Sequence, residues 1–112
     1  MAGVQSPSNF HDSLQHRAKV KFIDENTELG VNDQVVEVDS SSNTVEVKLP
    51  NITEAIGRMY FITAPSGGTN NVTVKDLDDT TIWTDIVLGS DDDRICVISD
   101  GRMWWVLTQE SN

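Results

Sequence analysis

The sequence predicts an all-β fold: a single-domain antiparallel sandwich or barrel with a short extended N-terminal arm. Two observations carry this prediction. Short runs of alternating apolar and polar residues recur at spacings of about ten residues, separated by clusters of Gly, Asn, Asp and Ser. Frequent Thr and Val, with few Ala-rich or Leu-rich stretches, disfavour helix as the main element. Because 112 residues leave room for one core, we expect an arm over residues 1–17 and one β domain over residues 18–112.

The strongest local signal lies in residues 94–108, where two apolar runs flank Asp100 and Gly101. Asp-Gly favours a two-residue hairpin turn, because both residue types tolerate positive φ. We therefore predict a two-residue hairpin. Val97 points to one face of the first strand and Cys96 to the other, so both faces carry apolar groups. This pattern is typical of a strand in a sheet that is covered on both sides.

A second hairpin is predicted from residues 34–38 and 44–49, which flank a polar connection. Val alternates with Glu and Lys in both runs, so one face is expected in the core and the other in water. The connection at residues 51–57 has room for one helical turn, closed by Gly57. The same alternation predicts further strands at 19–23, 58–63, 72–77 and 82–88.

The net charge of −10 argues against binding of nucleic acid, whose phosphates would be repelled. The charge is unevenly distributed. Residues 1–22 hold three basic residues and one acidic residue, whereas residues 23–112 hold five basic and seventeen acidic residues. The arm is therefore either a segment that reaches for an acidic surface or a short solvated tail. No apolar run is long enough to cross a bilayer, so we expect no membrane partner.

No catalytic or metal-binding pattern emerges. His11 and His16 lie in the arm without Cys, and Cys96 lies in an apolar strand, where a lone Cys is more typical of the core than of a nucleophile. The acidic runs at 78–79 and 91–93 lack the alternating oxygen ligands and central Gly of a calcium loop. We expect neither enzymatic activity nor a cofactor or metal ion.

Aromatic residues are the remaining functional candidates. Trp83, Trp104 and Trp105 fall in predicted strands, and tryptophans in a small β domain are most often core or subunit-interface residues. We take these three as candidate subunit-interface residues, with the division between core and interface left open. Together with Tyr60 they are also candidates for a platform that stacks against sugar rings.

The order of motifs from about residue 34 to 108 resembles a family pattern. Its most distinctive parts are Gly57-Arg58-Met59-Tyr60 and the run Ser-Asp-Gly-Arg-Met-Trp-Trp at 99–105. The full series comprises Thr44 to Pro50, Gly57 to Ile62, Gly67 to Asn71, Val72 to Val74, Ile82 to Leu88, Ile95 to Gly101 and Trp104 to Leu107. This series is similar to a module found in virion proteins of tailed bacteriophages, including head fibres, head decoration proteins and tail fibres.

The resemblance implies a trimeric β-structured component of the virion surface. A chain of this size with a short arm fits a capsid decoration, or cement, protein that binds and stabilises the phage head. The expected partners are the major capsid protein and two further copies in a homotrimer. The expected location is the capsid surface, after synthesis in the host cytoplasm. The alternative is a tail-fibre or head-fibre module that binds a host receptor or glycan.

In a decoration protein, the arm would be the capsid-docking element. Phe10 and Leu14 are the candidate apolar anchors, with a spacing that suits one helical turn. Arg17, Lys19 and Lys21 would supply attraction to an acidic lattice, weakened by salt. Because the arm has too few apolar residues to fold alone, we expect it to gain order only from a partner.

Overall fold

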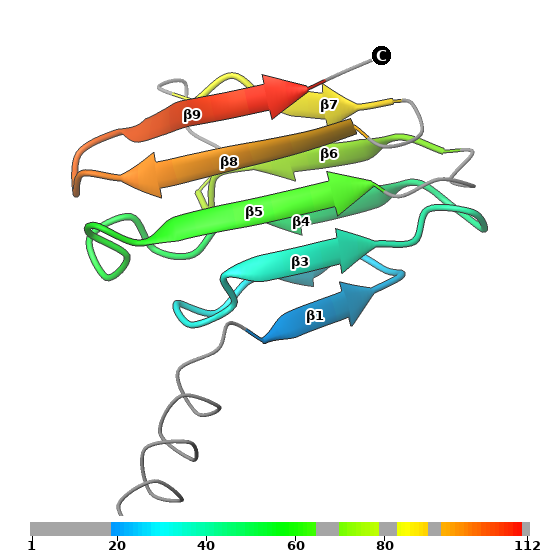
Figure 1. Cartoon of the computed structure of the whole chain (residues 1–112), viewed down its shortest axis with the longest axis horizontal. Helices are drawn as coiled ribbons and strands as arrows, with labels where there is room; N and C mark the ends of the chain where they lie inside the picture. The colour runs from blue at the N-terminus through cyan, green and yellow to red at the C-terminus, as the bar shows by residue number, and fades with distance from the viewer. Residues whose placement is uncertain (1–18, 65–69, 79–82, 90–92, 111–112) are drawn as a thin grey trace, which may run out of the picture.

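The computed structural model describes residues 19–64, 70–78, 83–89 and 93–110, and within these residues it contains nine strands and no helix. Two open sheets pack face to face, so the prediction of an all-β single domain is confirmed, as a sandwich (Figure 1). The first sheet has the order β1 (Val20–Ile23), β3 (Val35–Val38), β5 (Met59–Ala64), β8 (Asp93–Ser99), β9 (Trp104–Glu110). The second has the order β2 (Thr27–Glu28), β4 (Val45–Lys48), β6 (Val72–Lys75), β7 (Ile86–Leu88).

Both sheets are mixed rather than antiparallel throughout. The chain crosses from the first sheet to the second three times, from β1 to β2, from β3 to β4 and from β5 to β6. Each crossing is a β-arch, and successive arches stack so that β1, β3 and β5 pair in parallel, as do β2, β4 and β6. The predicted hairpin of residues 34–38 and 44–49 is therefore wrong, because its two strands lie in different sheets.

Alternation of side chains identified the faces of these two strands correctly, but not their partners. Val36 and Val47 are fully buried in the same core, as the pattern required. The connection between the strands explains why they separate. Ser40, which is 1% exposed, donates its hydroxyl to the Asn70 carbonyl at 2.7 Å, and the Asn70 side-chain amide donates to the Ser40 carbonyl at 2.8 Å. These bonds bind the β3–β4 arch to the residues that precede β6.

The hairpin of β8 and β9 is confirmed, although its connection is longer than predicted. Ser99 pairs with Trp104, so four residues make the turn instead of two. The Asp100 backbone N–H donates to the Met103 carbonyl at 3.1 Å, and Gly101 takes a φ of +92°. The wider loop forms because the Asp100 carboxylate caps it from within. A bulge between Cys96 and Val97 then shifts the register of the two strands.

The core lies between the sheets and is built from Val, Ile and Leu around three aromatic residues, Tyr60, Trp83 and Trp104. Tyr60 is fully buried and donates its hydroxyl to the Val31 carbonyl at 2.7 Å. The Trp104 ring meets the Tyr60 ring edge to face, with centroids 5.6 Å apart. The predicted strand at 82–88 shortens to Ile86–Leu88, and the connection at 51–57 forms turns without a helix. Within the described ranges, no helix has the length and apolar content that a bilayer-spanning segment needs.

Candidate interaction surface

The two sheets present contrasting outer faces. In the first sheet many of the residues that alternate with the core positions are also large and apolar, and we call these outward-pointing apolar side chains the apolar outer face. Glu37, Thr63 and Arg94 make one end of the same side polar. Their exposed fractions are high for apolar groups, 72% for Phe22 and 51% for Trp105. The exposed members of the face are Val20, Phe22, Met59, Phe61 and Trp105.

Strand register makes the apolar outer face continuous across the sheet. Met59 on β5 is paired with Ile98 on β8, which is paired with Trp105 on β9. In the other direction, Phe61 pairs with Val35 on β3 and so joins Val20 on the edge strand β1. Side chains in adjacent paired positions contact one another directly. The face therefore runs from one edge of the sheet to the other, and none of the described residues covers it (Figure 1).

A shallow hollow of about 260 Å³ lies on the same side of the sheet, towards its polar end. Arg94 and Glu110 form an ion pair on one wall, and Phe61 and Cys96 contribute to the lining. Cys96 is only 2% exposed, and burial raises the pKa of its thiol. A neutral, buried thiol is a poor nucleophile, so Cys96 acts here as a small apolar group.

The exposed indole of Trp105 is held in a fixed orientation. Its Nε1 donates to the Oδ2 of Asp100 at 2.8 Å, while the Oδ1 of Asp100 accepts from the backbone N–H groups of Arg102 and Met103. These three bonds, led by that of the indole, lower the pKa of Asp100 to about 2. The Asp100 carboxylate therefore stays ionised at neutral pH, and the indole needs little further ordering when a partner covers it.

The two most distinctive motifs meet at one end of the first sheet. The Gly57 backbone N–H donates to the Ser99 carbonyl at 2.8 Å, and the Ser99 hydroxyl donates to the Ile52 carbonyl at 2.7 Å. Gly101 approaches Ile56 so closely that an added Cβ would lie 2.9 Å from its Cδ1. Residues far apart in the sequence thus form one structural unit beside Trp105.

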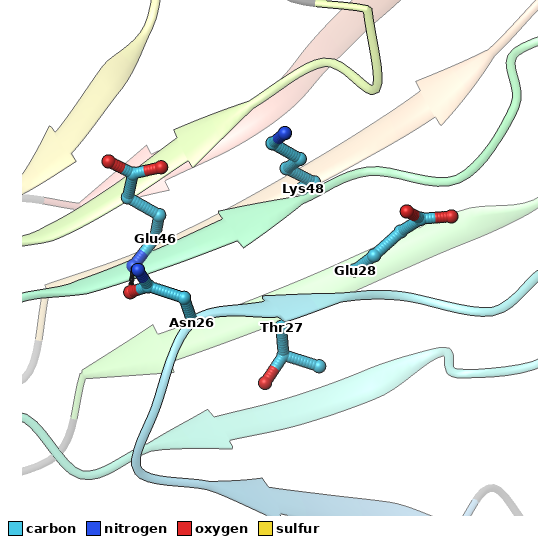
Figure 2. Close-up of a pocket in the computed structure, with 5 residues that line it drawn as sticks. All are labelled: Asn26, Thr27, Glu28, Glu46 and Lys48. Atoms are coloured by element: carbon cyan, nitrogen blue, oxygen red, sulfur yellow. Dashed lines mark hydrogen bonds between the residues drawn. The ribbon is translucent and has the colours of Figure 1, made fainter.

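The outer face of the second sheet is polar. The Nζ of Lys75 lies 3.8 Å from the Oε2 of Glu46 and 3.8 Å from the Oδ2 of Asp85. Such ion pairs are typical of a solvated surface. A hollow of about 280 Å³ lies on this face. In Figure 2 the side chains of Glu46, Lys48 and Glu28, which line it, extend to the same side. Asn26 closes one end by accepting the Glu46 backbone N–H at 2.8 Å. Charged groups of both signs line this open hollow. Among the described residues, no buried side-chain nitrogen or oxygen lacks a hydrogen bond.

The three candidate tryptophans occupy different environments. Trp83 is 9% exposed and donates its Nε1 to the Val74 carbonyl at 3.0 Å, and Trp104 is 8% exposed beside Tyr60. Both indoles fill the core of their own chain, whereas Trp105 lies on the surface. The four-ring sugar platform is therefore wrong, because three of its rings are buried.

The candidate capsid-docking residues are only partly within the described ranges. Phe10, Leu14 and Arg17 lie outside them. Lys19 is exposed immediately before β1. Lys21 is half-buried on the inner side of β1, and its Nζ lies 3.2 Å from the Oδ2 of Asp33. Its charge is therefore already paired within the chain.

Sequence reasoning missed most of the apolar outer face. Phe22, Met59 and Phe61 are not among the candidate site residues, although each alternates with a core residue in its strand. The signal was present, because apolar residues on both sides of a strand predict that both sides are covered. The described residues of one copy cover only one of them.

The described residues contain no group of three or more His, Cys, Asp or Glu side chains arranged to hold a metal ion. No protein-family model, no curated protein and no solved structure matches this chain.

Proposed function

We propose that this chain is a viral structural protein, a capsid decoration or cement protein that binds the head of a tailed bacteriophage and stabilises it as a trimer. The observation that carries the proposal is the uncovered apolar outer face. An acidic chain with an apolar sheet face across five strands needs a protein partner to remove that face from water.

Two further observations support this reading. The motifs that resemble phage head and fibre modules, Gly57-Arg58-Met59-Tyr60 and residues 99–105, supply Met59 and Trp105 to the apolar outer face. The second sheet turns charged residues to the opposite side, where a surface protein contacts water. One molecule thus offers a face for association and a face for solvent.

Copy number tests the proposal against the fibre alternative. Virions that contain this protein are purified, and its amount relative to the major capsid protein is measured by quantitative mass spectrometry. A decoration protein covers the lattice, so hundreds of copies per particle are expected. A handful of copies would instead indicate a fibre or tip that binds a host receptor or glycan, and would contradict the decoration function.

A binding experiment tests the role of the arm. Undecorated heads are mixed with full-length protein or with a variant lacking residues 1–17, and the bound fraction is measured by sedimentation at several salt concentrations. We expect the truncated protein to remain folded and to lose attachment. Binding equal to that of the full-length protein would assign attachment to the β domain alone.

Two single substitutions provide a matched pair for the electrostatic contribution. Lys19→Gln removes an exposed charge next to the arm, whereas Lys21→Gln removes a charge that Asp33 already pairs. We expect Lys19→Gln to weaken binding to heads at low salt more than Lys21→Gln does. Equal losses of binding in the two variants would show that the contribution of each lysine to head binding depends on its distance from the capsid surface and not on whether its charge is already paired within the chain.

A further inference from the structure

We propose that copies of this chain associate edge to edge, with β9 of one copy pairing in parallel with β1 of the next. The inference deepens the proposed function, on which it rests for the number of copies, by identifying the subunit contact. Three such contacts close a ring in which the three apolar outer faces turn towards a common axis. The partner of the apolar outer face is therefore the same chain.

Strand β9 is the longest edge strand among the described residues and contains one bulge, at Leu107. Natural proteins protect their edges with short strands, Lys, Pro or bulges that twist the edge away. Among the edges in the described ranges, β2 has two residues and β7 has three. Strand β9 has seven residues, carries no charge before Glu110, and exposes Trp105, Val106 and Leu107 by 43–52%. Its one paired neighbour is β8. An edge of this kind is a template for another strand.

The directions and lengths of β9 and β1 suit a parallel pairing. Strands β1, β3 and β5 are parallel, and two antiparallel pairings through β8 return β9 to the same direction (Figure 1). Copies related by rotation about an axis along the strands therefore place β9 parallel to β1 of the neighbour. The four residues of β1 are enough to span the regular apolar start of β9, which runs from residue 104 to 106 before the bulge at Leu107.

Charged residues of opposite sign lie near the starts of these two strands. Lys19 precedes β1, and Asp100 lies in the turn that precedes β9. In a parallel pairing both residues fall at the same end of the contact. The hydrogen bonds from Trp105 and the turn keep the Asp100 carboxylate ionised, so it can attract a cation of the neighbouring copy as well as Arg102 of its own turn. An antiparallel pairing would instead carry Lys19 to the end at which Glu110 is already paired with Arg94.

The exposed apolar area of the first sheet is close to the area that one partner buries in a standard protein interface. A fully buried aromatic side chain removes about 150–250 Å² from water, so the exposed parts of Phe22, Phe61 and Trp105 supply about 350 Å². Adding Val20, Met59 and Leu107 brings the apolar area to the order of 600 Å², near the ~800 Å² that one partner buries in a standard interface. A patch of this size is at the upper end of what a monomer exposes.

The dimensions of the sheet suit three copies. Five strands about 4.8 Å apart make each side of a three-sided prism about 24 Å wide, which places the middle of the side about 7 Å from the axis. In two packed sheets, the side chains of each sheet fill half of the separation, which is about 5 Å. The middle of each side of the prism lies farther than this from the axis, so larger side chains are needed there to fill the space. The middle strand is β5, and it directs Met59 and Phe61 to this side.

Substitutions at the two edges test the contact. Val106→Lys with Leu107→Lys changes β9, and Val20→Lys with Phe22→Lys changes β1. Val87→Lys is the matched control, because Val87 is 48% exposed on the edge strand β7 of the other sheet. Sedimentation equilibrium measures the mass at micromolar concentration. We expect a trimer for the wild type and the control, and monomers for both edge variants, with dissociation constants raised at least about 30-fold.

Mixing the two edge variants gives the decisive result. The β1 variant keeps an intact β9 and the β9 variant keeps an intact β1, so an equimolar mixture should form a one-to-one heterodimer that cannot close. A mixture that stays monomeric, or a β1 variant that remains oligomeric, would overturn the proposal. Circular dichroism confirms that each variant is folded, and Leu107→Lys alone replaces the double β9 variant if that one does not fold.

The outcome is separable from that of the proposed function. A wild-type protein that is monomeric at this concentration overturns the edge contact, whatever its copy number on virions. A wild-type trimer that dissociates in both edge variants establishes the contact, even if the protein fails to bind undecorated heads. In that second case the decoration function fails while the subunit contact stands.

Discussion

The Trp105 indole donates its Nε1 hydrogen bond to the Oδ2 of Asp100 at 2.8 Å, although Trp105 is 51% exposed. The same carboxylate closes the turn by accepting two backbone N–H groups. One acidic side chain thus determines both the shape of the β8–β9 connection and the orientation of the largest group on the apolar outer face.

Acid should weaken this turn in a defined range. The pKa of Asp100 is lowered to about 2, from 3.8 in an unperturbed chain, so its stabilising effect is fully present above about pH 4. It is lost as the pH falls from about 4 to 2. We expect Asp100→Asn to lower the midpoint of thermal unfolding at pH 7 and to reduce the dependence of that midpoint on pH below 4, both measured by circular dichroism.

The control for Asp100 is a carboxylate outside the turn. Asp24 is exposed, and Asp24→Asn should leave the acid dependence unchanged. An unaltered acid profile in the Asp100 variant would show that other carboxylates control stability in this range.

Removing the Tyr60 hydroxyl should destabilise the domain without disturbing its packing. Tyr60→Phe keeps the ring beside Trp104 but leaves the Val31 carbonyl without its 2.7 Å bond. The net value of such a bond is about 1 kcal/mol, which should appear as a lower free energy of unfolding in urea. Val31 is only partly buried, so a loss well above about 2 kcal/mol would mean that the ring itself has moved.

Gly57 and Gly101, the glycines with positive φ among the described residues, should respond differently to alanine. Gly57 has a φ of +77° and open space around its α-carbon, so Gly57→Ala should cost about 1–2 kcal/mol from backbone strain alone. Gly101→Ala adds a 2.9 Å approach to Ile56 and should cost more. Urea unfolding compares the two, and Ile56→Ala in the Gly101→Ala background should restore only the steric part. Equal costs at both positions would show that Ile56 moves aside freely.

The stacking of the arches depends on Ser40. Ser40→Ala removes a buried hydroxyl that donates to the Asn70 carbonyl, and we expect a loss of about 1–2 kcal/mol in the free energy of unfolding. Ser42 lies in the same connection but is exposed, so Ser42→Ala serves as the control and should be neutral. Similar values for both variants would indicate that the Ser40–Asn70 contact contributes little.

The sequence predicted which side chains are buried better than it predicted which strands pair. Alternation depends on the local pleat, so Val36 and Val47 were assigned to a face that the structure buries. Pairing depends on where the chain turns. The polar run at 39–43 suits a hairpin and an arch equally well, and the choice is made by Asn70, about thirty residues away.

The candidate surface was predictable only in part. Trp105 was among the candidate interface residues. Which of the neighbouring tryptophans is buried and which is exposed depends on which face of the first sheet the second sheet covers. That covering depends on all three arches and is not encoded near Trp104 or Trp105. Phe22 and Phe61 could have been predicted as interface residues, because a strand with apolar residues on both faces is expected to be covered on both faces.

The stacked arches also bear on how the chain folds. Each parallel pair joins residues separated by a whole arch, whereas β8 and β9 are joined by four residues. Contacts between distant residues require larger loops to close, so they form late and slowly. We expect the β8–β9 hairpin to be structured in the folding transition state and the β1–β3 pairing to form afterwards. Substitutions in β8 should then slow refolding, and substitutions in β1 should mainly speed unfolding.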